Sequence, residues 1–251
     1  MRPRRNEDIV GRYSIPGAYP LQAIGIPGRT WPWLLGAPTV VVTVLLLLHD
    51  VIAVFICYHV LICLVLPLVR NGLVLKRPVK AHFRDLGLIG AGTARGVVIG
   101  LILGSVLAGG TLVLFRLQGD ALLAENNVAG ILSQWGVTPS RLWLLQGFML
   151  LVNGPAEELF WRGFIHHELA GVRPRQLALG VASLCYASYH AATLMLLLGS
   201  ALVAALLFVA VLAGGLIWAW LRERTGSVWP GLLSHWMATV AYMLVARPLL
   251  W

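Results

Sequence analysis

The chain has 251 residues, of which 59% are hydrophobic and 12% charged, and its formal net charge is +9. A soluble domain carries about 25% charged residues, so the composition excludes an ordinary soluble protein and indicates a polytopic membrane protein. The basic residues stand at the ends of apolar segments, where they set topology and meet lipid headgroups, and this placement argues against nucleic-acid binding.

The N-terminal part predicts a tail and then a pair of membrane helices. Residues 1–30 have no apolar core behind their arginines and predict a cytoplasmic tail, not a cleaved signal peptide. Residues 31–251 contain no polar stretch long enough to fold alone and predict a single membrane domain. Residues 31–69 are apolar almost throughout, which is long for one span and short for two. His49 and Asp50 predict a turn between two spans, with one tilted helix as the alternative.

The rest of the chain predicts five further membrane helices. A basic loop over 70–86 precedes a span at about 92–115, whose glycines allow close packing against a neighbouring helix. The polar segment 116–141 predicts an external loop with a short surface helix. After it we expect four helices, at about 140–170, 175–197, 200–221 and 229–247. The predicted fold class is therefore all-α, with six to seven transmembrane helices.

The helix predicted at about 140–170 carries three ionisable residues within the stretch NGPAEELFWRGF. Charged groups at this depth cost from about 3 to over 10 kcal/mol, so they persist where they pair, line a cavity or take part in chemistry. Glu158 and Arg162 are four residues apart and predict an ion pair on one helix face. Glu157 lies about 100° round the helix, with Asn153 as its only polar neighbour on that face. Glu157 therefore needs a partner from another helix, or else a proton.

Two later helices offer such partners. CYASYHAA places Tyr186 and His190 four residues apart, and SVWPGLLSHWMAT places His235 and Thr239 four residues apart. Glu157 and His190 both lie roughly 20 Å from the cytoplasmic ends of their helices, at 1.5 Å per residue. A carboxyl group in an apolar, partly wet cavity suits general acid–base catalysis.

The remaining polar residues in apolar runs are interpreted as structural. His166 and His167 are expected at the cytoplasmic interface, where the C-terminal end of a helix favours them. His49, Asp50 and His59 have no chemical role assigned. No chemical role is assigned to the three cysteines either. They are interpreted as small buried hydrophobic residues and are Cys57, Cys63 and Cys185. Pro155 predicts a bend or a loosened turn just before Glu157.

Three motifs follow one another within about residues 140–247, namely Glu157-Glu158-x-x-x-Arg162, Tyr186-x-x-x-His190 and His235-x-x-x-Thr239. In this order, with the SVWPGLLSH lead-in, the motifs resemble those of the CPBP family of intramembrane proteases. This family, also called the CAAX protease or Abi family, includes the Ras-converting CAAX endopeptidases. The resemblance implies an all-helical membrane fold with a cavity open to the cytoplasmic leaflet.

The resemblance also implies a role for each motif residue. Glu157 would be the general base and His190 its partner in activating water, with Glu158 and Arg162 as a brace. His235 and Thr239 would stabilise the oxyanion. Two positions depart from the family pattern, because tyrosine replaces the usual phenylalanine at 186 and threonine replaces the usual asparagine or aspartate at 239. The shorter threonine hydroxyl weakens the oxyanion site, where loss of a donor costs about 10²–10³ in rate.

The favoured mechanism uses no cofactor. Zinc held by Glu157, His190 and His235 is the alternative, because two histidines and a carboxylate around an open position match a catalytic zinc site, although HExxH is absent. The expected partners are a peptide or lipid-modified protein substrate and membrane lipids, but no nucleic acid.

Two other function classes remain open from the sequence. A non-catalytic scaffold or regulator, for example of the bacteriocin-immunity type, would keep the family fold. A transporter or proton relay also uses buried Glu and His, but the chain lacks paired broken helices in two matching halves. The arginine-rich composition and short loops favour a multi-pass protein of a bacterial inner membrane with a cytoplasmic N-terminus.

Overall fold

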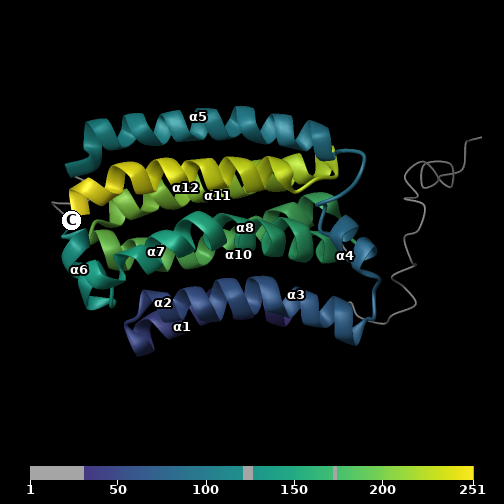
Figure 1. Cartoon of the computed structure of the whole chain (residues 1–251), viewed down its shortest axis with the longest axis horizontal. Coiled ribbons are helices and arrows are strands. Elements are labelled where there is room, and N and C mark those ends of the chain that lie inside the picture. Colours follow the sequence, from purple (N-terminus) through teal and green to yellow (C-terminus); the bar gives the residue numbers. More distant parts are fainter. Residues whose placement is uncertain (1–30, 121–126, 172–173, 251) are drawn as a thin grey trace, which may run out of the picture.

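The computed structural model describes residues 31–120, 127–171 and 174–250, which are mostly helical and contain no strand (Figure 1). The predicted tail, residues 1–30, lies outside the described residues. The N-terminal half contains α1 (Trp31–Leu48), α2 (Val51–Val54), η3 (Phe55–Val65), α3 (Leu66–Leu68), η4 (Val69–Val74), α4 (Val79–Asp85) and α5 (Thr93–Gly119). The C-terminal half contains α6 (Val128–Gln134), η6 (Pro139–Arg141), α7 (Leu142–Phe148), η7 (Met149–Asn153), α8 (Gly154–Glu158), η8 (Leu159–Ile165), α9 (His166–Ala170), α10 (Arg175–Leu198), α11 (Ala201–Thr225) and α12 (Trp229–Leu250).

Several of these elements join end to end into long helices. Within the described residues there are seven long helical segments, which are α1, 51–74, α5, 142–170, α10, α11 and α12. Four of them are long and apolar enough to cross a membrane, namely Val51–Val74, Thr93–Gly119, Arg175–Leu198 and Ala201–Thr225, and Pro32–Leu48 is a shorter apolar helix. Large apolar side chains also face outward, such as Leu117 (71% exposed) and Leu151 (76% exposed), as lipid contact requires. The prediction of an all-α polytopic membrane protein is confirmed.

The first apolar run is two helices joined by a tight turn at His49 and Asp50. His49 has a positive φ of 50°, and the Asp50 carboxylate caps the second helix by accepting from the backbone amides of Ile52 (2.8 Å) and Ala53 (3.2 Å). An aspartate in this position satisfies amides that have no partner within the helix. The two-helix prediction is therefore confirmed, and the single tilted helix is wrong.

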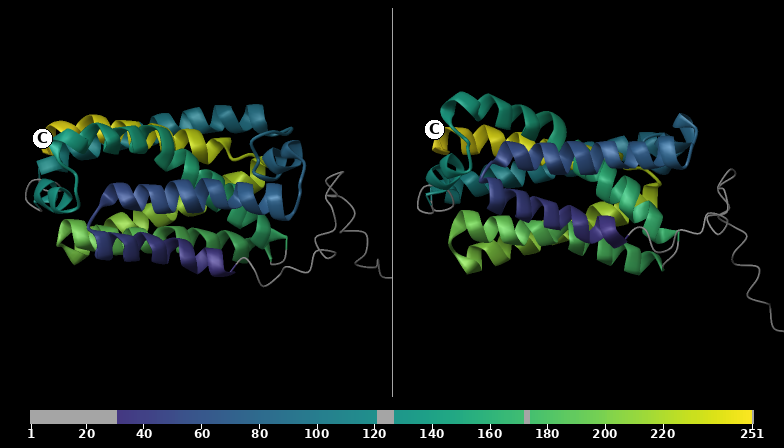
Figure 2. Two further views of the ribbon diagram at one scale, coloured as in Figure 1. Left: turned by 60° about the horizontal axis from the view of Figure 1, so that its bottom comes forward. Right: turned by 90° about the horizontal axis from the view of Figure 1, so that it is seen from below.

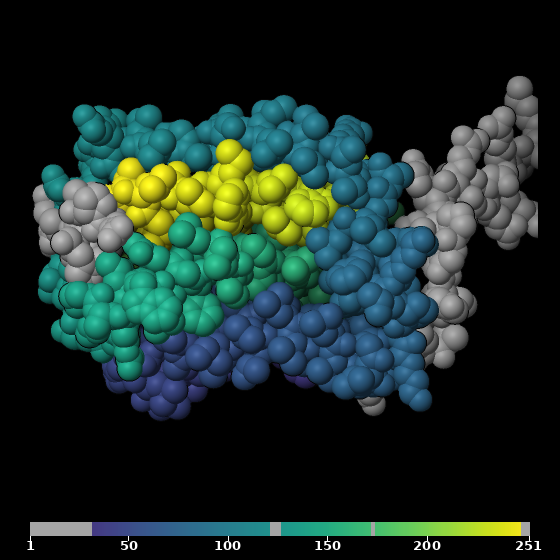
Figure 3. Space-filling view, in the orientation of Figure 1, coloured from purple at the N-terminus to yellow at the C-terminus, as the bar shows by residue number. Residues whose placement is uncertain are grey.

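The basic loop predicted over 70–86 is largely helical. The preceding helix continues to Val74, and α4 occupies Val79–Asp85. An ion pair between Arg77 and Asp85 (2.7 Å) spans α4, and the Arg222 guanidinium donates to the backbone carbonyl of Asp85 at 2.8 Å. Segment 75–92 thus contacts the ends of α11 and α12, and Figure 3 shows it beside the end of α12. The Arg77–Asp85 ion pair and the contact with Arg222 stabilise a helix in a segment where the many basic residues alone predicted a loop.

In the view of Figure 1 the helices form bands, with α5 and α12 on one side, the N-terminal helical hairpin, residues 31–74, on the other, and the helix over 142–170 with α10 between them. The turned views of Figure 2 show that α1 runs beside α10. Gly96, Gly100 and Gly104 form a small-residue stripe on α5, and a Cβ at any of them would come within 3.0 Å of α12 or the residues just before it. The predicted close packing of the glycine-rich span is confirmed.

Replacing Gly100 with alanine is expected to destabilise the protein, because its Cβ would lie 2.7 Å from the Trp229 carbonyl oxygen. Overpacking costs about 1–3 kcal/mol, more than the gain of up to about 1 kcal/mol that alanine brings to a helix interior. Thermal unfolding of the purified protein should show a midpoint lower by about 2–4 °C per kcal/mol lost. Gly109→Ala is the matched control, since no described atom lies within 4 Å of that Cβ. Equal midpoints for the two variants would contradict close α5–α12 packing.

Candidate active site

The helix over 142–170 changes its winding around the acidic pair. Two stretches are π-helical, Met149–Asn153 and Leu159–Ile165, and the short α8 between them holds Glu157 and Glu158. Pro155 stands in the first turn of α8, where it removes a backbone donor, and the loosened winding agrees with the predicted effect of that proline. At Gly154 α8 lies close to α12, since a Cβ there would be in ordinary van der Waals contact with the backbone of Trp236 at 3.4 Å.

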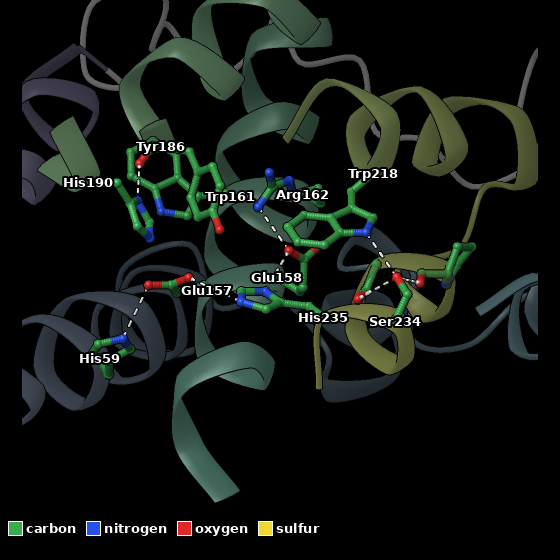
Figure 4. Close-up of polar contacts among 12 residues, drawn as sticks. His59, Glu157, Glu158, Trp161, Arg162, Tyr186, His190, Trp218, Ser234 and His235 are labelled. Carbon is green, nitrogen blue, oxygen red and sulfur yellow. Dashed lines mark hydrogen bonds and ion pairs between the residues drawn. The ribbon is translucent and has the colours of Figure 1, made fainter. Parts of the chain in front are cut away.

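Glu157 is buried, and its two carboxylate oxygens have different surroundings (Figure 4). Oε1 accepts a hydrogen bond from the Tyr189 hydroxyl and lies 3.2 Å from Nε2 of His59. Oε2 has no hydrogen-bond partner among the described residues and lies 3.9 Å from Nε2 of His235. The partners of this carboxylate therefore come from three other helices, and one oxygen is left unbonded.

Glu158 is held by a cation instead. Its Oε1 accepts from Arg162 Nη1 at 2.9 Å, and both side chains are buried, with 0% and 2% exposure. The Arg162 guanidinium lies between two aromatic faces, 4.1 Å from the Tyr186 ring centre and 5.1 Å from that of Trp218. Aromatic faces attract a desolvated cation, so the pair is stabilised on both sides. The predicted i,i+4 pair is present.

His235 is fixed in orientation by contacts on its edge and its face. Its Nδ1 lies 3.3 Å from Glu158 Oε1, and its ring stacks on Trp218 with centres 4.7 Å apart and planes at 14°. Trp218 is in turn held by a hydrogen bond from its Nε1 to Ser234 Oγ at 2.9 Å. Because a carboxylate only accepts, Nδ1 carries the proton, and Nε2 is the nitrogen that faces Glu157.

His190 is half-buried and is directed toward Glu157 in Figure 4. Its Nδ1 donates to the Tyr186 carbonyl at 3.2 Å, so Nε2 is left as the free nitrogen of the ring. The ring packs against Tyr189, with centres 4.1 Å apart. No hydrogen bond joins His190 to Glu157 in the described part of the chain.

Two further sequence-predicted residues make fewer contacts. Thr239 is buried one turn beyond His235 on α12, and its hydroxyl bonds to no other described residue. Asn153 begins the turn before Gly154, and its side chain likewise has no hydrogen bond within the described residues, so a polar link to Glu157 is not formed.

The sequence interpretation missed two partners of Glu157 and one partner of His166. His59 was given no chemical role, yet it contacts Glu157 across 98 positions of sequence, a distance that no local spacing encodes. Tyr189 immediately precedes His190 in the second motif, and this adjacency is the one feature of the sequence that could have indicated its contact with Glu157. His166, predicted at the cytoplasmic interface, is buried against the protein, and Glu223 near the end of α11 contacts its Nε2 at 2.7 Å.

The site also depends on glycines that bring backbones close to its charges. A Cβ at Gly231 would lie 2.1 Å from Glu158 Oε2, and one at Gly215 would lie 3.0 Å from Arg162 Nη2. Larger residues at these positions would displace the Glu158–Arg162 pair. Among the described residues, no three His, Cys, Asp or Glu side chains are grouped in a way that could hold a metal ion.

Residues 139–241 match the family model described as type II CAAX prenyl endopeptidase Rce1-like. This segment runs from η6 into α12 and contains all three motifs. The resemblance drawn from the motifs is therefore confirmed over this segment of the chain. The family is one of proteases, and the apolar helices make this chain an integral membrane protein. Comparison with curated proteins and with solved structures gave no match.

Replacing Arg162 with methionine is expected to destabilise the protein by about 3–5 kcal/mol, because Glu158 would remain buried without its cation. The double variant Glu158→Gln/Arg162→Met should recover part of this loss, since both charges are gone. Denaturant or thermal unfolding in detergent measures both. Arg141→Met is the control, because its pair with Asp50 is largely exposed and should be worth under about 1 kcal/mol. A loss for Arg162→Met no larger than that of the control would contradict the buried brace.

Proposed function

We propose that the protein is an intramembrane endopeptidase that hydrolyses a peptide bond near the cytoplasmic leaflet, with Glu157 as the general base. The observation that carries this proposal is the combination of contacts at Glu157. Both glutamates have a buried Oε2 without a hydrogen-bond partner among the described residues, but only Glu158 is paired with an arginine. Oε1 of Glu157 is held by donors from two other helices, and its Oε2 faces Nε2 of His235 at 3.9 Å. A carboxylate that is held at one oxygen and unbonded at the other suits proton abstraction at a fixed point.

Charge pairing supports the choice of Glu157 over Glu158. Arg162 neutralises Glu158 in a close buried pair, so this carboxylate acts as a brace. Glu157 has no such cation, and its neighbours are a tyrosine and histidine rings. Its Oε2 would take a proton from water while the water oxygen bonds to the peptide carbonyl carbon. The carbonyl oxygen then becomes an oxyanion, and the proton passes to the leaving nitrogen as the C–N bond breaks.

The histidines and Thr239 take the remaining roles in this scheme. His190 keeps Nε2 free because Nδ1 donates to the Tyr186 carbonyl, and Nε2 would accept a hydrogen bond from the attacking water. His235 would bind the oxyanion through Nε2 when both ring nitrogens carry protons, and the unbonded Thr239 hydroxyl would add a second donor. Preorganised donors of this kind supply a large share of the rate in acyl transfer.

The proposed substrate is a peptide or a lipid-modified protein that reaches the site from the bilayer, in keeping with the prenyl endopeptidase family. We place the protein in a bacterial inner membrane with its N-terminus in the cytoplasm. The cytoplasmic end would be the one where most basic residues of the described chain gather, which are Arg70, Lys76, Arg77, Lys80, Arg84, Arg95, Arg175, Arg222 and Arg224. An excess of basic residues marks the cytoplasmic side of a membrane protein.

Replacing Glu157 with glutamine is expected to lower peptide cleavage by at least about 10²-fold, because an amide cannot take a proton from water. The assay uses the purified full chain in lipid nanodiscs and a fluorescence-quenched farnesylated peptide ending in a CAAX sequence. Mass spectrometry of peptide termini, in membranes that hold wild type or the variant, extends the test to unmodified substrates. Glu223→Gln is the matched control, a carboxylate that also contacts a histidine but lies away from the site.

The same assays separate the alternative functions. Equal phenotypes in cells for wild type and Glu157→Gln, with no cleavage by either, would support a non-catalytic scaffold and overturn the protease proposal. The proposed mechanism needs no metal, so cleavage should survive treatment with a chelator. Cleavage that is lost to the chelator and restored by zinc would replace it with the zinc form.

We expect kcat to depend on the donor that residue 239 offers to the oxyanion. Thr239→Val keeps the shape but removes the hydroxyl, and kcat should fall by about 10²-fold if this group binds the oxyanion. Thr239→Asn supplies a longer amide donor and should match or exceed wild type. Both are measured as kcat on the farnesylated probe, with thermal unfolding as a check on folding. A kcat for Thr239→Val equal to that of wild type would remove Thr239 from the oxyanion site.

A further inference from the structure

One contact in the site comes from outside the segment that matches the family. His59 lies on η3 in the N-terminal hairpin, whereas the match covers residues 139–241. The ring is buried, and its Nε2 lies 3.2 Å from Oε1 of Glu157. Figure 4 shows it on the side of the carboxylate away from Glu158 and Arg162.

We propose that His59 is a positioning residue for the catalytic base. Together with Tyr189 it holds Oε1 of Glu157, so that Oε2 is the oxygen that reacts. This inference rests on the proposed function of Glu157. It makes the N-terminal hairpin part of the catalytic unit, since the base is only half held without it.

Hydrogen-bond chemistry defines the direction of both contacts. An ionised carboxylate only accepts, so the Tyr189 hydroxyl and the His59 Nε2–H both donate to Oε1. A neutral ring with its proton on Nε2 fulfils this role. The terminal torsion of a glutamate is broad and roughly two-fold, so the carboxylate alone has no preference between its two oxygens. Two donors from different helices give it that preference.

His59 is itself held against the helix that carries Glu157. Its ring stacks on Phe55, with centres 4.5 Å apart and planes at 17°, and meets the edge of Tyr58. The Tyr58 hydroxyl accepts a hydrogen bond from Trp161 Nε1 at 2.7 Å. Trp161 is one turn beyond Glu157, so two adjacent hairpin residues contact two successive turns of the site helix. This fixes the register of the hairpin against Glu157.

Packing alone does not explain a histidine at this position. Its Nδ1 is buried and has no hydrogen-bond partner among the described residues, a cost that an apolar side chain of similar size would avoid. His59 also lies in a π-helical segment, 55–65, and π-helical segments precede and follow the short α8 that holds Glu157, a winding that recurs at functional sites. The contact between Nε2 and Glu157 is what distinguishes histidine from leucine here.

The test compares His59→Leu and His59→Gln with wild type, using the full chain in nanodiscs and the farnesylated peptide probe. His59→Leu removes the donor, and kcat should fall by about 10- to 100-fold, the range for hydrogen bonds to charged groups, with KM within about threefold. Glutamine carries an amide donor at similar reach, so His59→Gln should return kcat to within about threefold of wild type. His82→Leu is the control, because that buried histidine bonds to Asn71 instead, and its kcat should be unchanged.

Each outcome separates this inference from the proposed function. A lower kcat for leucine, rescued by glutamine, supports the positioning role. Equal kcat for wild type and His59→Leu, while cleavage still requires Glu157, overturns the positioning role alone. Equal losses in the leucine and glutamine variants also overturn it, since they indicate a packing role. Absence of Glu157-dependent cleavage in the wild type overturns the proposed function and this inference with it.

A second variant keeps the test decisive if His59→Leu fails to fold. Tyr189→Phe removes only the other donor to Oε1 and leaves the ring in place. Its kcat should also fall by about 10- to 100-fold, with KM within about threefold. Tyr242→Phe is its matched control, because that tyrosine packs against Phe115 and makes no hydrogen bond to Glu157. A kcat for Tyr189→Phe equal to that of Tyr242→Phe would overturn the shared hold on Oε1.

Discussion

Two adjacent carboxylates buried in an apolar helical bundle are the constraint on which the rest of the structure depends. A charge at this depth is costly unless it is paired or hydrogen-bonded. The chain meets the requirement differently at each position. Glu158 has a cation at 2.9 Å on its own helix, and Glu157 has a hydroxyl and an imidazole from other helices. Because neighbouring residues point about 100° apart on a helix, they meet different surroundings, and only one of them is neutralised locally.

Much of the neighbouring packing serves this pair. The Arg162 cation needs two aromatic faces and the absence of a side chain at Gly215, and Glu158 needs the same absence at Gly231. Trp218 contacts two groups of the site at once, because it lies beside the Arg162 guanidinium and stacks on the His235 ring. Substitutions in α11 or α12 would therefore displace the carboxylates by altering the packing around them, although the described residues of these helices place no negatively charged side chain in the site.

Prediction from the sequence succeeded where the interaction is local or periodic. The helices, the turn at Asp50, the Glu158–Arg162 pair and the glycine stripe on α5 all follow from spacing within one segment. It failed where two distant segments meet. The contact between His59 and Glu157 spans 98 positions, and nothing in either local pattern selects the other. The Glu223 partner of His166 and the helix α4 were missed for the same reason, because Glu223 and Arg222 approach them from α11.

The different surroundings of the two glutamates also account for the different roles proposed for them. A carboxylate with a close cation and a second polar contact, as at Glu158, is a structural element that connects its own helix with α12. Each glutamate is bonded at Oε1 only, and each Oε2 is buried without a hydrogen bond among the described residues. At Glu158 the Arg162 cation offsets the cost of desolvation, whereas Glu157 has no such cation. Retaining Glu157 in this state lowers stability, and on the proposed mechanism reactivity is the property that compensates for it. On the proposed mechanism, the N-terminal hairpin contributes by holding one oxygen and leaving the other free.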